Sequence, residues 1–490
     1  MAKVDFGEWF PDQPINENPG AIEAKNCIPS ARSYRPFYSL SEFAGALNGA
    51  CVGSYYARSS SEALYTFFAS ASKLYRLVSG TTVSDVSKTA TTYSADFWDF
   101  VNFKDRIIAT DGGAGNLQYY DMDTSTEFAD LPGSPPRFKC LGIVGNFVVG
   151  GNYSIGSEVE PGGLAWCGFN NSELWTPSLA TQSQRRRTRS EGAAVQRIVS
   201  GTVGLVFREL SIAPVRYIGP PVVFDTTEVL VRHGTPAPQS VAWTKQFVFY
   251  YSNEGFFRIN RNDFSVDPIG VNKVNMWLLD NIAAGDIVNI KGAVDIRNNL
   301  VMWAFRSSTS AVTYDRIIVF DYANNRWSYA EINTEWLGEF AADAANLDTL
   351  DAVLGSGGID INSINVDTDA YHGVAGNFMG FTPNHAAATF DGAPLIAEID
   401  TTELGLEGRR SYVNGVRPIV EGASTVEVAP LTRDLPSASP VLGNFTGVTA
   451  LTGQCDLRSD ARYQRFRCRI TGGFDKAQRL EYDIKRRGRQ

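Results

Sequence analysis

The sequence predicts an all-β protein: a β-propeller of six to eight blades, with seven as the best estimate, followed by a sandwich-like C-terminal module. Three observations predict this fold. Short aromatic and β-branched runs are cut by turn residues along the whole chain, these runs recur roughly every 40 to 55 residues, and the pattern changes near residue 395. The expected divisions are an extended N-terminal segment (1–45), the propeller (46–394), and a β-rich module with a basic tail (395–490).

The clearest repeat unit lies between residues 204 and 270. Its run FVFYY at 247–251 is followed by a turn at 253–255 and a second apolar run at 256–259. Similar runs open near residues 64, 106, 147, 205, 247, 300 and 352. Several strands within such a period are typical of propeller blades. A stack of β-sandwiches needs about 100 residues per unit and fits this spacing less well.

The two ends of the chain differ from the repeats. Five prolines between residues 11 and 36 exclude a continuous helix in this region. Beyond residue 395, stretches such as Ser424–Ala429 and Tyr463–Ile470 alternate in a way that is typical of strands with one solvated face. The best helix candidate is the short amphipathic stretch Lys273–Asn281, and no apolar run is long enough to predict a transmembrane helix.

The composition limits the classes of partner and the state of the cysteines. The 490-residue chain has a formal net charge of −9 and a pI of about 5.1, whereas proteins that neutralise DNA phosphates are usually basic. An acidic protein is compatible with a channel through which DNA passes without adhering. Six scattered cysteines without a CxxC pattern predict reduced, mostly buried thiols in a protein made in a cytoplasm, with Cys455 facing Cys468 across a hairpin as the alternative.

No residue pattern indicates catalysis or metal binding. The GxSxG, P-loop, HExxH and EF-hand patterns are absent from the sequence. The three histidines, His233, His372 and His385, are too dispersed to predict a zinc site. We therefore expect a protein that is not an enzyme, with no catalytic residues, no cofactor and no metal.

Two groups of arginines stand out against the acidic background. The run QRRRTR at 184–189 is expected in a loop between the third and fourth units, where it would meet DNA phosphates or an acidic partner, with a solvated loop as the alternative. Odd-numbered arginines along Tyr463–Ile470 share one strand face and are expected to contact a neighbouring subunit. The candidate interaction residues are Arg185, Arg186, Arg187, Arg189, Arg462, Arg465, Arg467 and Arg469.

Six ordered segments give the chain a resemblance to a known family. They are FGEWFPDQP near the start, WCGFNNSELWTPS at 166–178, RELSIAPVRYIGPPVVFDTTEV at 208–229, SNEGFFRI at 252–259, DPIGVNKVNMWLLD at 267–280 and RIIVFDYANNRWS at 316–328. The set resembles the β-propeller tail hub, or nozzle, proteins of short-tailed bacteriophages, which are also called tail tubular or packaged-DNA stabilisation proteins. The resemblance covers about residues 5–335 and is looser beyond them.

The resemblance implies a structural protein of the virion tail that is synthesised in the host cytoplasm. Such hubs form homo-hexameric rings below the portal and its head–tail adaptor, continue the channel of the packaged double-stranded DNA, help to retain and eject the genome, and anchor tail fibres or spikes. DNA would pass through the lumen without sequence-specific binding. Because QRRRTR would retard DNA there, we expect it to face the adaptor or a fibre. A receptor- or glycan-binding propeller, with or without glycan-degrading activity, and a bacterial interaction module unrelated to virions remain the alternatives.

Overall fold

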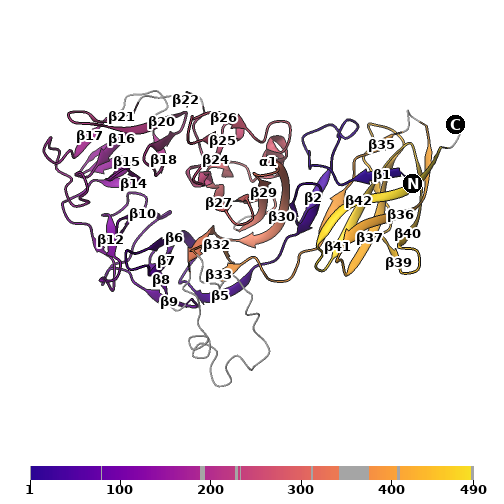
Figure 1. The fold of residues 1–490 in the computed structure, drawn as a ribbon, viewed down its shortest axis with the longest axis horizontal. Helices are drawn as coiled ribbons and strands as arrows, with labels where there is room; N and C mark the ends of the chain where they lie inside the picture. Colours follow the sequence, from indigo (N-terminus) through magenta and orange to yellow (C-terminus); the bar gives the residue numbers. More distant parts are fainter. Residues whose placement is uncertain are drawn as a thin grey trace, which may run out of the picture.

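The protein consists of a ring of β-sheets joined at one side to a second β-module, as the computed structural model in Figure 1 shows. The structure describes residues 2–78, 80–187, 194–226, 230–231, 233–310, 313–341, 375–405 and 409–486. Within these ranges the chain forms strands β1 to β42, one α-helix and two short 3-10 helices. The all-β prediction is therefore confirmed.

The ring is built from four-stranded antiparallel meanders around a central axis. Six are separate sheets, one of them with a fifth strand. A further meander, β27–β30, belongs to a larger sheet, and its first strand contacts the first strands of both flanking meanders. These arrangements confirm the predicted propeller of six to eight blades. The strands are β6 Cys51–Arg58, β7 Leu64–Ser70, β8 Leu74–Val78 and β9 Thr82–Asp85; β10 Asp99–Phe103, β11 Arg106–Thr110, β12 Gln118–Asp121 and β13 Ala129–Asp130; β14 Arg137–Val144, β15 Phe147–Ile155, β16 Glu158–Trp166 and β17 Gln184–Arg186; β18 Val195–Val199, β19 Gly204–Arg208, β20 Ser211–Gly219, β21 Val223–Asp225 and β22 Leu230–Val231; β23 Ala242–Trp243, β24 Phe247–Ser252, β25 Gly255–Asn260 and β26 Val266–Pro268; β27 Lys291–Asp295, β28 Leu300–Phe305, β29 Tyr314–Asp321 and β30 Arg326–Thr334; and β31 Leu337–Ala341, β32 Ala375–Phe381 and β33 Ala386–Thr389 with β5 Ser41–Ala46.

The apolar runs that recur in the sequence are the second strands of the meanders. β7, β11, β15, β19, β24 and β28 begin within one residue of the expected starts. All six residues of β28 are buried, because neighbouring sheets cover both of its faces. The expected seventh run, at 352–364, lies outside the described residues; the second strand of the last meander is β32.

The N-terminal part of the chain closes the ring. β5 pairs antiparallel with β33 and completes the last meander, with Glu42 opposite Ala388 and Ser41 opposite Thr389. The side chain of Phe43 stacks on Phe340 of the same sheet at 4.6 Å between ring centroids. This pairing covers the outer strand that the last meander would otherwise expose, and it joins two parts of the sequence more than 300 residues apart.

The C-terminal module is built from two facing sheets and includes the N-terminal strands. One sheet contains β36, β40 and β42 with β1 added at its edge, and the other contains β34, β37 and β41. β39 pairs with a strand of each sheet, and side chains such as Phe466 and Tyr482 pack between them. The strands are β1 Ala2–Asp5, β2 Glu23–Lys25, β3 Cys27–Pro29, β4 Tyr34–Pro36, β34 Ala397–Asp400, β35 Leu404–Gly405, β36 Ser411–Glu421, β37 Thr425–Arg433, β38 Val441–Leu442, β39 Thr446–Thr449, β40 Gln454–Ala461, β41 Tyr463–Thr471 and β42 Lys476–Arg486.

One sheet runs without interruption from the ring into the module. The short strand β2 pairs parallel with β30 at Lys25 and Tyr329, and antiparallel with β34 along its other edge. Residues 1–45, expected as an extended segment, thus contribute five strands that are divided between the ring and the module. Hydrogen-bonded sheet, rather than a flexible linker, connects the two parts.

The predicted short helix is α1 Asn275–Asn281, which begins two residues later than expected. The carboxylate of Asp12 accepts hydrogen bonds from the backbone N–H groups of Met276 and Trp277, at 2.9 and 2.8 Å. Trp277 packs edge-on against Trp9, with 5.0 Å between ring centroids. The N-terminal segment therefore satisfies the free N–H groups of a helix 264 residues away in the sequence. The 3-10 helices are Pro238–Ser240 and Asp286–Asn289.

All six cysteines are buried free thiols, as predicted. Cys455 and Cys468 do not face each other across a hairpin, because β40 and β41 belong to opposite sheets of the module. Both side chains lie in the apolar core between these sheets. Within the described parts of the chain, no helix has the length and apolar character needed to span a bilayer.

Candidate functional site

The first strands of all seven meanders line a cavity on the axis of the ring. It has a volume of about 410 Å³, and aromatic side chains such as Tyr55, Trp243 and Trp336 form much of its wall. This volume lies within the range of small-molecule pockets. A DNA duplex does not fit through it.

Asp99 is the most deeply buried carboxylate beside this cavity. Its oxygens accept a hydrogen bond from the backbone N–H of Leu141 at 2.9 Å and form an ion pair with Arg197 at 3.1 Å. Burial raises the pKa of Asp99, and Arg197 opposes the rise. These contacts join β10, β14 and β18, so the group holds adjacent blades together. No local sequence motif marks Asp99 as part of such a group.

Two further titratable groups lie near the axis. Burial raises the pKa of Glu339 to about 7, while a hydrogen bond with Tyr56 lowers it. Burial lowers the pKa of Lys291 to about 8. The ammonium of Lys291 lies 4.6 Å from the ring centroid of Tyr314 and 4.7 Å from that of Trp336. No local sequence motif distinguishes these groups, because their burial depends on how the ring closes.

The first half of the predicted basic loop is an outer strand. Residues 184–186 form β17, which pairs with β16 at the edge of the third blade. Arg186 donates a hydrogen bond to the carbonyl of Phe224 in the fourth blade at 3.0 Å, and Arg187 forms ion pairs with Glu158 and Glu160 of its own sheet.

Arg185 therefore differs from the other arginines of this run that the structure describes. Its side chain is exposed. Arg189 lies outside the described residues. Arg187 is also exposed but is held by its ion pairs, so among the described candidates of the QRRRTR run Arg185 is the exposed arginine without an ion pair to the rest of the described chain.

The arginines of β41 have partners within the chain. Arg467 lies opposite Asp400 of β34 and donates two hydrogen bonds to its carboxylate, at 2.6 and 3.0 Å. Arg469 lies opposite Glu398 and donates one at 3.0 Å, and Arg465 lies 3.5 Å from Asp400. The expected shared face is present, and its arginines pair with carboxylates of β34, the adjacent strand of the same sheet.

Arg462 lies apart from this row. It precedes β41, and its backbone N–H donates a hydrogen bond to Asp434 at 3.2 Å. Arg462 therefore lies outside the strand that carries Arg465, Arg467 and Arg469.

The joint between ring and module contains a buried acid. Glu23 of β2 accepts a hydrogen bond from the hydroxyl of Tyr329 on β30. Burial raises the pKa of Glu23 to about 7; Asp400 adds to the rise, and Arg467 opposes it. Glu23, Tyr329, Asp400 and Arg467 thus form one polar network. This network connects β30 of the propeller to β34 and β41 of the module. No local sequence signal marks this network, because its members are far apart along the chain.

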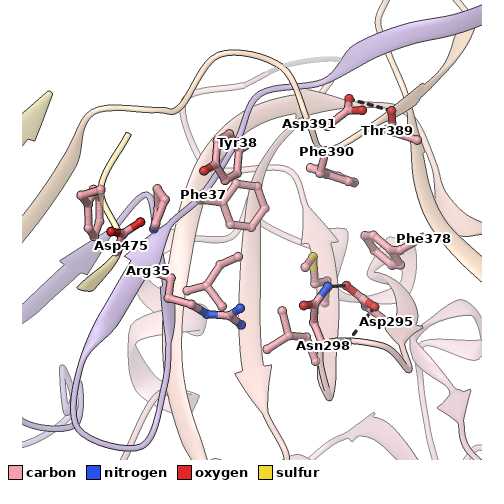
Figure 2. A pocket seen from close by; sticks show the side chains of 15 residues that line it. Arg35, Phe37, Tyr38, Asp295, Asn298, Phe378, Thr389, Phe390, Asp391 and Asp475 are labelled. Atoms are coloured by element: carbon pink, nitrogen blue, oxygen red, sulfur yellow. Dashed lines mark hydrogen bonds between the residues drawn. The ribbon is translucent and has the colours of Figure 1, made fainter. Parts of the chain in front are cut away.

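A second pocket of about 400 Å³ lies where the ring, the N-terminal strands and the module meet (Figure 2). Its apolar wall includes Phe37, Phe378 and Phe390, whose rings pack against one another at 5.3 to 5.5 Å between centroids. Arg35 and Asp475 are among the polar groups that line it. Sequence reasoning did not select any of these residues.

The described residues contain no group of three or more potential metal ligands of the His, Cys, Asp and Glu types. His385 lies 2.7 Å from Glu335, and His233 lies 3.9 Å from Glu254. His372 lies outside the described residues.

No protein-family model matches this chain, and no curated protein matches it. Several solved structures are similar in fold. The extracellular domain of a putative one-component system from B. thetaiotaomicron is 9% identical with a TM-score of 0.40, over 86% of this chain and 47% of that one. This chain thus spans less than half of that structure.

Two smaller structures are also similar. Virginiamycin B lyase from Staphylococcus aureus is 12% identical with a TM-score of 0.38, over 62% of this chain and 94% of that one. The Pan2 WD40 domain from Neurospora crassa is 7% identical with a TM-score of 0.37, over 64% of this chain and 90% of that one. At these identities the similarities concern the fold alone.

Proposed function

We propose that this chain is the tail hub, or nozzle, subunit of a short-tailed bacteriophage. In this proposal it has a structural role without catalysis, forms a homo-hexameric ring below the portal and head–tail adaptor, and anchors tail fibres or spikes. The order of the six family-like sequence segments suggests the role. The observation that supports it best is the joint, where β2 unites a propeller blade and the module in one sheet. Such a joint suits a part that must keep its shape while DNA is held under pressure.

The small axial cavity determines where DNA would pass in this proposal. A volume of about 410 Å³ suits a small molecule, so the channel would run through the centre of the ring of subunits and not through the propeller. The formal net charge of −9 would limit adhesion of DNA to that channel, because like charges repel.

Two groups of exposed apolar side chains would form the contacts between subunits. A cyclic ring requires two different surfaces on each copy, one for each neighbour. In Figure 1, strands β17, β20 and β21 lie at one end of the long axis and β39 lies at the other. Exposed apolar residues near the first end are Phe169, Leu179, Tyr217, Ile218 and Val222. On β38, on β39 and in the turn after β39, the exposed apolar residues are Val441, Leu442, Val448 and Leu451.

Exposed apolar groups of this kind often mark interfaces. In the proposed ring, the first group of one copy would contact the second group of the next. Arg185 lies on β17, beside the first group, and would contact the adaptor or a fibre protein.

Electron microscopy tests the proposal at two levels. In the first experiment, immunogold labelling of particles released from the host that encodes the chain is expected to mark one vertex of each particle. In the second, the purified full chain is mixed with the adaptor of those particles, and the images are expected to show six-fold rings with a central opening. Labelling that is absent from the particles, or spread evenly over the capsid, would contradict the proposal. Replacing Leu451 with Asp should prevent ring formation, whereas the same change at Val288, an exposed apolar residue outside both groups, should not.

A further inference from the structure

We propose that the pocket between ring and module, lined by Arg35, the three phenylalanines and Asp475, binds a short neutral saccharide. Its volume of about 400 Å³ lies within the range of small-ligand sites, and such sites occur preferentially at the meeting of domains. It is separate from the axial cavity and from the two apolar groups proposed for ring contacts. The proposal therefore goes beyond the hub function and does not depend on it.

The first observation that supports a ligand is a buried, unpaired N–H donor on Arg35. The Nε of Arg35 is buried and has no hydrogen-bond partner. Figure 2 shows the Arg35 side chain directed into the pocket. A buried donor without a partner is costly, and a ligand acceptor would remove this cost.

The second observation is an unpaired carboxylate in the same pocket. Asp475 is exposed, and within the described residues its carboxylate has neither a hydrogen bond nor an ion pair, although its backbone N–H binds Glu421. It also forms no ion pair with Arg35, although both residues line the pocket. The pocket thus presents a free donor and a free acceptor that do not satisfy each other.

The mixture of groups selects the class of ligand. Asp295, Asp391 and Asp475 line the pocket together with Arg35, and Asp295 and Asp391 accept hydrogen bonds from Asn298 and Thr389. A simple anion would be repelled by the three carboxylates. Hydroxyl groups both donate and accept, so a neutral polyhydroxylated ligand can bind the carboxylates as well as Arg35. In Figure 2 the labelled polar side chains lie on different sides of the pocket, which suits a ligand with several hydroxyls around its ring.

The aromatic wall provides the remaining part of a saccharide site. The rings of Phe378 and Phe390 stack with 30° between their planes, and the ring of Phe37 meets Phe390 edge-on. Phe37 and Phe378 are buried, at 1% and 8% exposure, so the half-buried ring of Phe390 is the part of this wall that a ligand can reach. The C–H face of a sugar ring packs well on such an apolar surface, while its hydroxyls point outward to the polar rim. Tyr38, whose side chain is 36% exposed, lies at the mouth of the pocket and offers a further aromatic face.

Ligand binding by the purified full chain tests this proposal. Isothermal titration calorimetry with maltose, cellobiose and lactose is expected to detect at least one sugar with a dissociation constant of about 1 mM or lower. Arg35→Met should weaken that binding about tenfold, because a hydrogen bond from a charged group is lost. The matched control Arg32→Met changes an exposed arginine three residues away and should leave binding unchanged.

Other outcomes would overturn the proposal. Absence of binding by all three sugars would do so, as would equal binding by the wild type and Arg35→Met. Tighter binding of glucuronate or of arginine amide would identify an anion or a cation site instead, and tighter binding of phenylalanine would identify an amino-acid site. Asp475→Asn provides a second variant, and it should also weaken binding of the sugar. Because the side chain of Asp475 is exposed, we expect this variant to fold normally.

Discussion

Replacing Arg467 with Met should destabilise the joint between ring and module. Arg467 donates two short hydrogen bonds to Asp400, whose side chain is only 1% exposed. Breaking a buried ion pair by removing one partner costs about 3–5 kcal/mol. Arg465 stays 3.5 Å from the same carboxylate and Arg467 is itself 22% exposed, so we expect a loss of about 2–3 kcal/mol in the free energy of unfolding.

Urea denaturation of the full chain measures this loss, with Arg469→Met as the matched control. Arg469 forms one hydrogen bond with Glu398, and that carboxylate keeps Lys25 at 3.2 Å when the arginine is removed. The control should therefore cost about 1 kcal/mol or less. If Arg467→Met costs no more than the control, the reasoning about the joint is wrong.

Three further changes test other parts of the structure. Burial raises the pKa of Glu23 from 4.5 to about 7. The contribution of Glu23 to stability is therefore complete below pH 4.5 and is lost as the pH rises to about 7. In the Glu23→Gln variant, the free energy of unfolding measured by urea denaturation should fall by up to about 3 kcal/mol less over this pH interval than in the wild type. Phe43→Ala should lower the free energy of unfolding by about 2 kcal/mol, because β5 loses its stacking contact in the closed ring, whereas Leu451→Ala at a position that is 93% exposed should have little effect. Asp12→Ala should cost about 1 kcal/mol by removing both hydrogen bonds at the start of α1, whereas Asp280→Ala on the same helix should be nearly neutral.

Each of these three has a result that contradicts it. A Glu23→Gln variant with the same pH dependence as the wild type would assign that dependence to other groups. Equal thermal midpoints for Phe43→Ala and Leu451→Ala would mean that β5 contributes little to closure. Asp12→Ala and Asp280→Ala with equal stabilities would mean that the helix does not need its distant cap.

The parts of the fold that could be predicted are those in which local sequence reflects burial. The second strand of each blade is covered on both faces. The sequence of β28 is therefore the uninterrupted apolar run LVMWAF, which predicts a strand by itself. The outer strand β17 has mixed burial and the sequence QRR, so it was read as a loop. The short strand β2 shows no clear pattern, although it joins the two halves of the molecule.

The candidate residues show the same limit. Alternation along β41 predicted that Arg465, Arg467 and Arg469 share a face, because side chains alternate in any strand. What that face meets depends on the register with β34, whose acids lie 67 and 71 residues earlier in the chain. The sequence therefore indicated the surface but not its partner.

The sequence by itself determined the all-β class, the spacing of the blades, the short helix and the reduced state of the cysteines. These properties depend on interactions within a few residues or on composition. Only the tertiary structure decided that β5 closes the ring, that β2 fuses ring and module, and that Arg35 and Asp475 line one pocket. Each of these contacts joins residues more than 300 positions apart, and their pairing is fixed by how whole sheets pack and not by any local pattern.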